Sequence, residues 1–241
     1  MQNKIILVIG PKGSGKTYTV CEAIRNMDRV VVFDMVHEEA YANVVLEKDN
    51  ANNVIVVGQP KEFVKAIAQD KDEFKVIYRP VNLEVIKGGL VETNEFGPIT
   101  KLVFLRGDCW FVIDEAHLLC NSHNCPKELM IANLLGRHRR MSLVLVAQSF
   151  TGIHPAIRKN ADEFMFWRII EPSDVEGIKQ RCGAEVAEKV QNLRPLERNP
   201  ETDELIRPGQ MLRWDKLNGV VEVTNQTPGG DNEDEMERDR R

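Results

Sequence analysis

The sequence has no apolar run that approaches the roughly 18 residues required by a membrane-spanning helix. Its first residues have the pattern of an interior strand rather than a signal peptide, so we expect a cytoplasmic protein. With 241 residues, of which 42% are hydrophobic and 29% charged, the chain suits one soluble domain with a sizeable core. Membrane-embedded and secreted proteins are therefore not expected.

Cysteines are few, and their number is odd. The five are widely scattered, at positions 21, 109, 120, 125 and 182, which argues against a disulfide framework. A zinc site is an alternative for part of them, because four potential ligands lie close together: His117, Cys120, His123 and Cys125. Their spacing matches no common zinc-ligand pattern, so a polar loop is the favoured interpretation.

An excess of basic residues is also missing. The formal net charge is −5, and the last eleven residues, 231–241, contain six acidic residues and three arginines. This tail contributes −3, so the rest of the chain carries −2. Bulk charge therefore gives no support to nucleic-acid binding, and any such surface must be local. The tail shows no apolar periodicity, and we expect it to be disordered.

Apolar runs alternate with amphipathic segments along the chain. This pattern predicts an α/β fold with a mainly parallel central sheet and helices on both faces. The expected strands are 4–9, 29–34, 53–57, 74–78, 109–114, 142–147 and 164–169. The expected helices are 16–26, 37–46, 61–69, 126–139 and 173–192, with Ser173 as the cap of the last one and 99–105 as a further candidate.

The pattern changes beyond Pro195. Residues 210–214 and 220–223 flank a turn-like segment, which predicts a C-terminal β-hairpin. No internal repeat and no long linker is visible. We therefore divide the chain into a core at 1–195, an extension with the hairpin at 196–228 and a disordered acidic tail at 229–241.

The chain opens with an apolar strand that leads directly into G-x-x-x-x-G-K-T at Gly10–Thr17, followed by an amphipathic stretch. This order of strand, loop and helix is what a P-loop requires. Its glycines let the backbone aim N–H groups at phosphates, Lys16 brings a positive charge to the β- and γ-phosphates, and the Thr17 hydroxyl is a ligand for Mg²⁺. The predicted ATP-binding residues are Gly10, Pro11, Lys12, Gly13, Ser14, Gly15, Lys16, Thr17 and Tyr18.

A second apolar strand, 109–113, ends in Asp114 and Glu115. A carboxylate at the tip of a central strand is where the magnesium ion of a P-loop site needs its anchor, so we assign Asp114 to the metal. The adjacent Glu115 can polarise water for in-line attack on the γ-phosphate. It also argues against nucleotide kinases and small GTPases, which usually lack this second acid. The alternatives for two consecutive acids at a strand end are a charge pair at a helix N-terminus and a simple solvated turn.

Gln148 follows the strand expected at 142–147. At that tip it can orient water or report loss of the γ-phosphate, and a polar residue that only meets solvent is the alternative. Hydrolysis also calls for an arginine, often from a neighbouring subunit. The candidates are Arg79, after a strand end, and Arg137 and Arg140, which can equally well compensate a helix C-terminus.

Four segments together resemble the FtsK/HerA superfamily of DNA-pumping P-loop ATPases: 10–17, 30–34, 112–117 and 136–148. The second ends in Asp34, like the family's strand near the P-loop. The last runs from Gly136-Arg137-His138 to Gln148 and is similar to the genome-packaging ATPases of tailless, membrane-containing viruses. The sequence shows no winged-helix domain and no long N-terminal barrel of the HerA type, so the resemblance is to a minimal ATPase core.

This resemblance implies that Lys16 and Thr17 bind nucleotide and Mg²⁺, that Asp114 and Glu115 are the magnesium and catalytic acids, and that Gln148 is the sensor. It also implies a RecA/FtsK-like core and a ring, commonly a hexamer, that threads double-stranded DNA through its pore. The implied function is to package a viral genome, inside the host cell or in association with the virion, with capsid or portal-vertex proteins as further partners. Arg158 and Lys159 are candidates for the pore, with a plain surface pair as the alternative.

Other interpretations stay open. Filamentous-phage assembly proteins of the zonula-occludens-toxin type share the Asp-Glu-Ala strand end and a related Arg-His segment, and act on protein partners. They normally continue into a membrane helix, which this sequence does not show. A small-molecule kinase would need a lid and an acceptor pocket. Residues 137–140 could imitate a lid, but Glu115 and Gln148 fit hydrolysis better.

Overall fold

The computed structural model describes residues 3–47, 50–68, 72–86, 91–202 and 204–226. Within them, a central sheet of nine strands has the order β13-β12-β9-β1-β8-β7-β2-β4-β3. The strands from β9 to β3 are mutually parallel. They are β1 (Ile5–Ile9), β2 (Arg29–Phe33), β3 (Asn53–Val57), β4 (Phe74–Arg79), β7 (Trp110–Ile113), β8 (Ser142–Ala147) and β9 (Glu163–Phe166).

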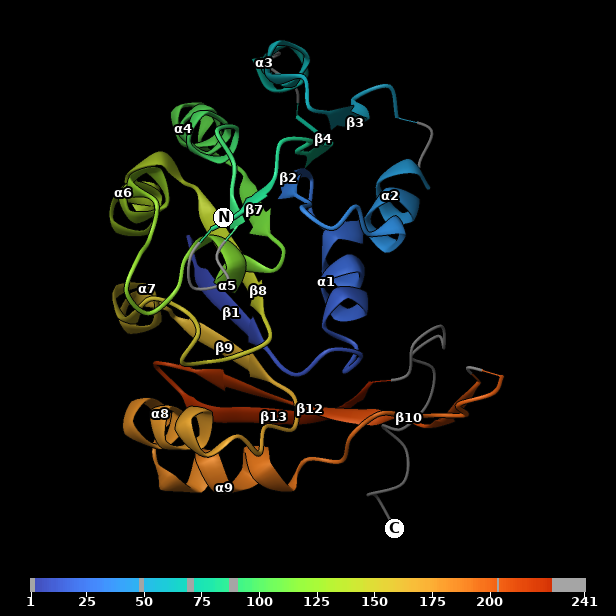
Figure 1. Ribbon diagram of the computed structural model, residues 1–241, viewed down its shortest axis with the longest axis vertical. Helices are drawn as coiled ribbons and strands as arrows, with labels where there is room; N and C mark the ends of the chain where they lie inside the picture. Colours follow the sequence, from blue (N-terminus) through green and yellow to red (C-terminus); the bar gives the residue numbers. More distant parts are fainter. Residues whose placement is uncertain (1–2, 48–49, 69–71, 87–90, 203, 227–241) are drawn as a thin grey trace.

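Helices cover both faces of this sheet (Figure 1). The side chains of Val8 and Val32 point to one face and join the apolar cluster of α1 (Lys16–Arg25) and α2 (Glu39–Leu46). Side chains alternate between the two faces along a strand, so Leu7, next to Val8, and Phe33, next to Val32, join the apolar cluster of the other face. That face is covered by α3 (Pro60–Ala68), α4 (Phe96–Arg106), α6 (Lys127–Leu135) and α7 (Pro155–Asn160). The predicted α/β architecture is therefore confirmed.

The predicted C-terminal hairpin is present and continues the central sheet. It consists of β12 (Gly209–Asp215) and β13 (Gly219–Gln226), and β12 pairs antiparallel with β9. Two further helices, α8 (Pro172–Cys182) and α9 (Ala184–Asn192), lie beside the hairpin at the bottom of Figure 1. The acidic tail predicted at 229–241 lies outside the described residues.

Several predicted boundaries were wrong for local reasons. The single helix predicted at 173–192 is two helices, because Gly183 adopts a φ of 101° between them. Its first helix begins at Pro172 with Glu171 as the preceding cap residue, so Ser173 lies inside the helix. The helix predicted at 126–139 ends at Leu135 and continues as a 3₁₀ turn, η1 (Gly136–Arg139).

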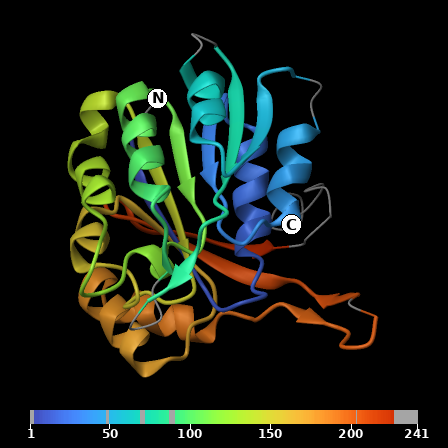
Figure 2. The same ribbon diagram turned by 45° about the horizontal axis from the view of Figure 1, so that its top comes forward.

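Short elements escaped the sequence pattern. They are the one-turn helix α5 (Ala116–Leu119), α7, and two small antiparallel pairs, β5 (Glu84–Val85) with β6 (Val91–Glu92) and β10 (Glu197–Arg198) with β11 (Leu205–Arg207). The β10–β11 pair forms an arm that projects from the body of the molecule (Figure 2). No helix in the part of the chain that the structure describes is long and apolar enough to cross a membrane.

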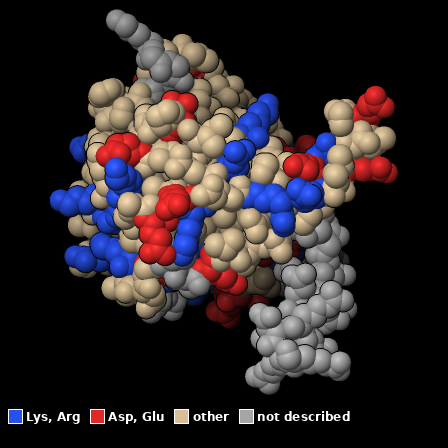
Figure 3. Space-filling model, turned by 90° about the horizontal axis from the view of Figure 1, so that it is seen from below, with Lys and Arg blue, Asp and Glu red and all other residues tan. Residues whose placement is uncertain are grey.

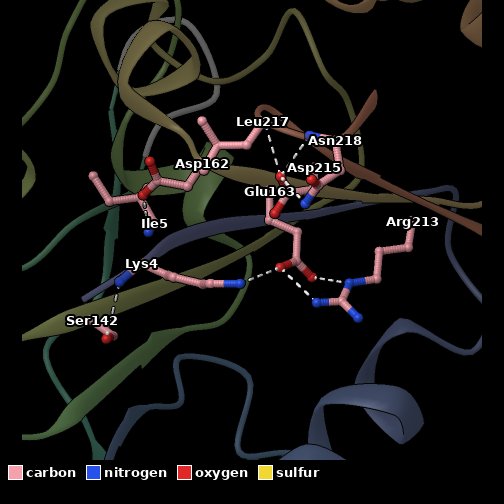
Figure 4. A network of polar contacts seen from close by, with 9 residues as sticks. All are labelled: Lys4, Ile5, Ser142, Asp162, Glu163, Arg213, Asp215, Leu217 and Asn218. Atoms are coloured by element: carbon pink, nitrogen blue, oxygen red, sulfur yellow. Dashed lines mark hydrogen bonds and ion pairs between the residues drawn. The ribbon is translucent and has the colours of Figure 1, made fainter. Parts of the chain in front are cut away.

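A buried ion-pair cluster joins the hairpin to the rest of the sheet (Figure 4). The Glu163 carboxylate, only 1% exposed at the start of β9, accepts from Lys4 Nζ at 3.2 Å and from Arg213 Nη2 at 3.0 Å. Lys4 immediately precedes β1, and Arg213 belongs to β12. The cluster thus ties three chain segments together at the amino-terminal edge of the parallel strands.

Candidate nucleotide-binding and catalytic site

The P-loop connects the end of β1 to the start of α1. Gly13 and Gly15 have positive φ angles of 74° and 99°, which other residues rarely adopt, and Gly15 directly precedes the first turn of α1. A Cβ at Gly10 would lie 2.8 Å from Trp167 Cβ, so a side chain does not fit there. A loop of this shape at the amino end of a helix is suited to bind phosphate groups.

Lys16 is held inside this loop. Lys16 is buried, with only 6% of the residue exposed, and its Nζ donates a hydrogen bond to the Pro11 carbonyl oxygen at 2.8 Å. Burial lowers the pKa of Lys16, while the nearby Glu115 and Asp114 charges oppose that shift. The ammonium group therefore lies where the phosphates of a nucleotide would bind, with the two acids facing it.

Asp114 lies at the carboxyl end of β7 and is 3% exposed. Burial is the main cause that raises its pKa to about 7, and the charges of Glu115 and Asp34 add to it. Asp114 and Glu115 together face the single positive charge of Lys16, which leaves a local excess of negative charge that a divalent cation would neutralise. Thr17 and Asp114 line the same cavity, so the residues present fit the predicted Mg²⁺ site.

Glu115 has an unusual backbone conformation, with a φ of 47°. A left-handed non-glycine residue is strained, and such strain is found at functional sites. Its side chain accepts a hydrogen bond from Gln148 Nε2 at 2.9 Å, and its other oxygen lies 3.3 Å from His117 Nδ1. Burial lowers the pKa of His117, which keeps the imidazole neutral near pH 7. The structure thus brings the predicted base and the predicted sensor into direct contact.

The sheet order explains this contact. Because β8 lies between β1 and β7, its carboxyl end places Gln148 between the P-loop and the two acids. The residues that follow are fixed by Asp174, which is 3% exposed in α8. Its carboxylate accepts from Phe150 N at 3.1 Å, from Thr151 N at 2.7 Å, and from the Ser149 and Thr151 hydroxyls at 2.9 and 2.6 Å. Asp174 therefore positions the segment that carries Gln148.

Arg79 is the last residue of β4, at the same edge of the sheet, but it is engaged within its own chain. Its Nε donates to Asp34 Oδ2 at 2.9 Å and its Nη2 to the Glu38 carbonyl oxygen at 3.0 Å. Asp34, fully buried at the end of β2, in turn lies near enough to Asp114 to raise its pKa. A role of Arg79 at the phosphates stays a prediction, since the guanidinium is committed to Asp34 here.

Arg137 and Arg140 lie at the opposite edge of the sheet. Both precede β8, whereas the P-loop follows the parallel strand β1, so neither can reach the nucleotide of its own chain. Arg140 lies 3.6 Å from Asp108, and Arg137 is exposed. Their role as a trans-acting arginine stays a prediction that only a neighbouring subunit could fulfil.

Two cavities border the P-loop. The larger, about 870 Å³, is lined by the P-loop residues Lys12–Tyr18, both acids, His117 and Gln148. The smaller, about 310 Å³, lies on the side of β9 and is lined by Pro11–Ser14 and by 167–171. Cavities of this size bind small molecules. Trp167 Nε1 and Ser14 Oγ are buried beside the loop with no hydrogen-bond partner in the described part of the chain.

The cavities also include residues that the sequence did not single out. The face of α1 and α2 contributes Arg25, Ala40 and Asn43, and Leu196 and Arg198 arrive from beyond α9. They have no motif, because distant segments meet here only through the fold. Asp174 likewise has no sequence signal apart from its place in the first turn of α8.

Two secondary expectations concern His117 and Arg158. His117 faces Glu115, and the described residues contain no group of three or more His, Cys, Asp or Glu arranged to hold a metal ion, so zinc has no support there. Arg158 is half-buried with its guanidinium 4.9 Å above the Phe150 ring, a packing contact. The pore role considered for Arg158 and Lys159 stays a prediction.

Comparison with known proteins places these features in a family context. A family model described as an AAA domain matches residues 1–151. No curated protein matches the chain. The AAA match covers the P-loop, Asp114, Glu115 and Gln148, and ends before α7.

Solved structures with the same fold are known. The genome packaging NTPase of Sulfolobus turreted icosahedral virus 2, in complex with ATP-γ-S, aligns with a TM-score of 0.65 and 18% identity over 93% of this chain and 97% of that one. The DNA-packaging ATPase of Sulfolobus turreted icosahedral virus aligns with a TM-score of 0.61 and 19% identity, over 95% and 99% of the two chains. At these identities the likeness shows a shared fold.

The amino-terminal domain of zonular occludens toxin from Neisseria meningitidis aligns less well. Its TM-score is 0.46 and its identity 10%, over 95% of each chain. A likeness of this degree carries no argument about function.

Proposed function

This chain belongs to the AAA domain family and is a P-loop ATPase, and on that premise we propose that it moves double-stranded DNA to package a viral genome into a capsid. The observation that carries the ATPase chemistry is the contact of Gln148 with Glu115 at the edge of the sheet where the P-loop lies. The similarity to an FtsK/HerA-like P-loop ATPase is confirmed at the level of fold. The packaging role is supported by the two structural neighbours, which are themselves named as genome- and DNA-packaging proteins.

The side chains divide the hydrolytic work. Lys16 binds the β- and γ-phosphates, and Glu115 accepts a proton from the water that attacks the γ-phosphate. Gln148 holds the Glu115 carboxylate in place through the 2.9 Å hydrogen bond and can exchange that partner for water or phosphate. Mg²⁺, held by Thr17 and Asp114, would neutralise charge on the phosphate oxygens.

The positions of the predicted arginines support an oligomer. Charge that develops on the transferred phosphoryl group is commonly stabilised by an arginine. None of the three predicted candidates is among the described residues that line the larger cavity, because Arg79 binds Asp34 while Arg137 and Arg140 lie at the other edge. We therefore propose a ring, most simply a hexamer, in which a neighbour completes each site.

The surface argues for local rather than broad DNA contact. Basic and acidic side chains are interspersed over the face on the side of α8 and α9 (Figure 3). A uniformly positive field is absent from the described residues of that face. DNA would then be contacted by small basic groups brought together around a pore, through its phosphates and without sequence preference.

The direct test is ATP hydrolysis with and without double-stranded DNA. We expect DNA to raise turnover and to bind an assembled ring, with both effects weakening steeply between about 50 and 200 mM salt. If double-stranded DNA neither stimulates turnover nor binds the assembled protein, the proposal is wrong. Stimulation by a capsid or membrane protein in place of DNA would instead favour the assembly-factor alternative of the zonula-occludens-toxin type.

A further inference from the structure

A helix beyond the matched AAA region binds the loop that follows the sensor residue. The AAA match ends at residue 151, whereas α8 begins at Pro172. Gln148 is the first residue after β8, and residues 149–151 come directly after it. The buried carboxylate of Asp174 in α8 accepts hydrogen bonds from all three of them. We call Asp174 together with residues 149–151 the clamp.

Both oxygens of the Asp174 carboxylate take part in the clamp. Oδ1 accepts from Thr151 N, from Thr151 Oγ1 and from Ser149 Oγ, and Oδ2 accepts from Phe150 N. The distance of 2.6 Å from Thr151 Oγ1 is typical of a charge-assisted hydrogen bond, which is about twice as strong as a neutral one. Since a buried carboxylate is costly without such donors, the clamp strongly favours this one conformation of the loop.

The same face of α8 packs closely on the loop at Gly177, three residues after Asp174. A Cβ at Gly177 would lie 2.9 Å from Phe150 Cδ1 and 3.1 Å from Thr151 Cγ2, so a side chain there would push the loop away. Residues three apart share one face of a helix. Two separate features of this face, a carboxylate and a missing side chain, therefore fix residues 149–151.

The helix α8 is held in place by contacts outside the clamp. Arg181 Nε donates to the Arg158 carbonyl oxygen at 3.1 Å, and its Nη2 donates to the carbonyl oxygens of Lys159 and Ala161 at 3.2 Å each. These contacts join the last turn of α8 to the carboxyl end of α7. Ile178 is fully buried in the apolar cluster of the sheet. Asp174 is thus a fixed point to which the loop is attached.

Gln148 depends on its backbone for its position. The residue is exposed, so packing does not hold its side chain, although Nε2 reaches Glu115 Oε1 at 2.9 Å. Its backbone is fixed by β8 on one side and by the clamp on the other. A displacement of about 1 Å at this point would break the hydrogen bond to Glu115, because such bonds rarely exceed about 3.2 Å.

We propose that Asp174 is a positioning residue for ATP hydrolysis, which acts through the clamp on Gln148 and thereby sets the contact between Gln148 and Glu115. This rests on the proposed part of Gln148 in hydrolysis and deepens it, because it makes α8 part of the hydrolytic machinery. A role in stability alone would leave the turnover of the folded protein unchanged. A role through Gln148 lowers turnover and depends on the presence of the glutamine.

Steady-state hydrolysis without DNA tests the first of these effects. Asp174→Asn keeps the shape of the side chain but replaces one acceptor oxygen by an amide that donates. Turnover should fall roughly tenfold, while KM for ATP should change less than about twofold because the P-loop is untouched. Glu163→Gln is the matched control, since it removes the charge of a carboxylate that is equally buried but lies at the other edge of the sheet. Its turnover should be unchanged, and circular dichroism checks that both variants are folded.

A double-mutant cycle tests the second effect. Asp174→Asn combined with Gln148→Ala should turn over as slowly as Gln148→Ala alone, because Asp174 has nothing left to position once the glutamine side chain is gone. Two independent effects of this size would multiply to a loss of about a hundredfold. Such a multiplied loss would overturn the proposal.

Thr151→Val supplies a milder change that does not depend on whether Asp174→Asn folds. It removes only the hydroxyl that donates to Asp174 at 2.6 Å and keeps the shape of the side chain. Turnover should fall about two- to fivefold in the wild-type background and not at all in Gln148→Ala. An unchanged rate in the wild-type background, or a loss that persists in Gln148→Ala, would overturn the positioning role and leave the ATPase function intact. Failure of the sensor role itself looks different, since Gln148→Ala alone would then hydrolyse ATP at the wild-type rate.

Discussion

The two edges of the parallel sheet differ in how well their charges are matched. At the carboxyl edge, Asp114 is buried among other carboxylates with a pKa raised to about 7, and Glu115 has a strained backbone with a φ of 47°. At the amino edge, Glu163 is more deeply buried still, yet it is paired with both Lys4 and Arg213. Two buried carboxylates at opposite edges of the same sheet thus differ, because Asp114 is left largely uncompensated whereas Glu163 is paired with two cations.

This difference separates stability from function. An unmatched buried carboxylate lowers the stability of the protein alone but provides binding energy for a cation and a phosphate when they arrive. A buried carboxylate that is already paired with cations of its own chain is not available to a ligand, and it stabilises the contact between chain segments. The carboxyl edge of the sheet is thus suited to bind and act on a ligand, whereas the amino edge stabilises the sheet.

Replacement of the catalytic base should have the largest effect. Glu115→Gln removes the group that accepts the proton from water but keeps the shape of the side chain, so turnover should fall by about 10²- to 10⁴-fold while ATP affinity is retained. Single-turnover hydrolysis and equilibrium binding measure the two quantities. An unchanged rate in this variant would remove Glu115 from the base role.

Asp114→Asn should make the nucleotide-free protein more stable at pH 8, by about 1 to 3 kcal/mol. The pKa of Asp114 is raised to about 7 from 3.8, so the folded state binds an extra proton between these pH values and stability falls as pH rises through that range. An asparagine carries no charge to bury and escapes this loss. Urea unfolding at pH 8 and at pH 4 measures it, and a variant equally destabilised at both pH values would contradict the account.

Glu163→Gln should act in the opposite direction at the amino edge. Loss of the carboxylate leaves Lys4 and Arg213 without their partner, which should lower the free energy of unfolding by about 1 to 3 kcal/mol, since both cations are partly exposed. Urea unfolding measures this change as well. Glu185→Gln is the control, because it breaks an exposed pair with Lys189 and should change stability little. A similar loss in both variants would refute the special role of the buried cluster.

The smallest of these effects concerns the sensor. Gln148→Ala removes the hydrogen bond that positions Glu115, and turnover should fall roughly tenfold, the equivalent of one such bond. Gln180 offers a matched control, since its Nε2 also donates to a glutamate, Glu176, at 3.0 Å on the surface of α8. Steady-state hydrolysis should be unchanged in Gln180→Ala. Equal rates for Gln148→Ala and the wild type would show that Glu115 is held by other contacts.

Much of the carboxyl edge could be predicted from sequence because it depends on local patterns. Apolar runs gave the strands, and the glycines and Lys16 gave the P-loop. Strand ends in a parallel sheet share an edge, which is why Asp114, Glu115 and Gln148 were expected together. Their direct contact follows from the position of β8 between β1 and β7.

The remainder depends on contacts between distant segments. In the sequence, Arg79 is an arginine at a strand end with no visible partner. Its pairing with Asp34 arises only because β2 and β4 are neighbours in the sheet. Residues 194–198 have no periodicity and no motif, so their approach to the P-loop follows only from the packing of β12 against β9. The break at Gly183 was visible as a glycine, yet the apolar pattern of the two helices ran across it.

Displacement of a third strand from a DNA triplex reports movement along double-stranded DNA driven by ATP, so it shows whether the protein is a DNA motor. The assembled wild-type protein should displace the third strand in the presence of ATP, and Glu115→Gln, which binds ATP but turns it over slowly, should not. ATP hydrolysis stimulated by DNA without any displacement of the third strand would contradict a motor function.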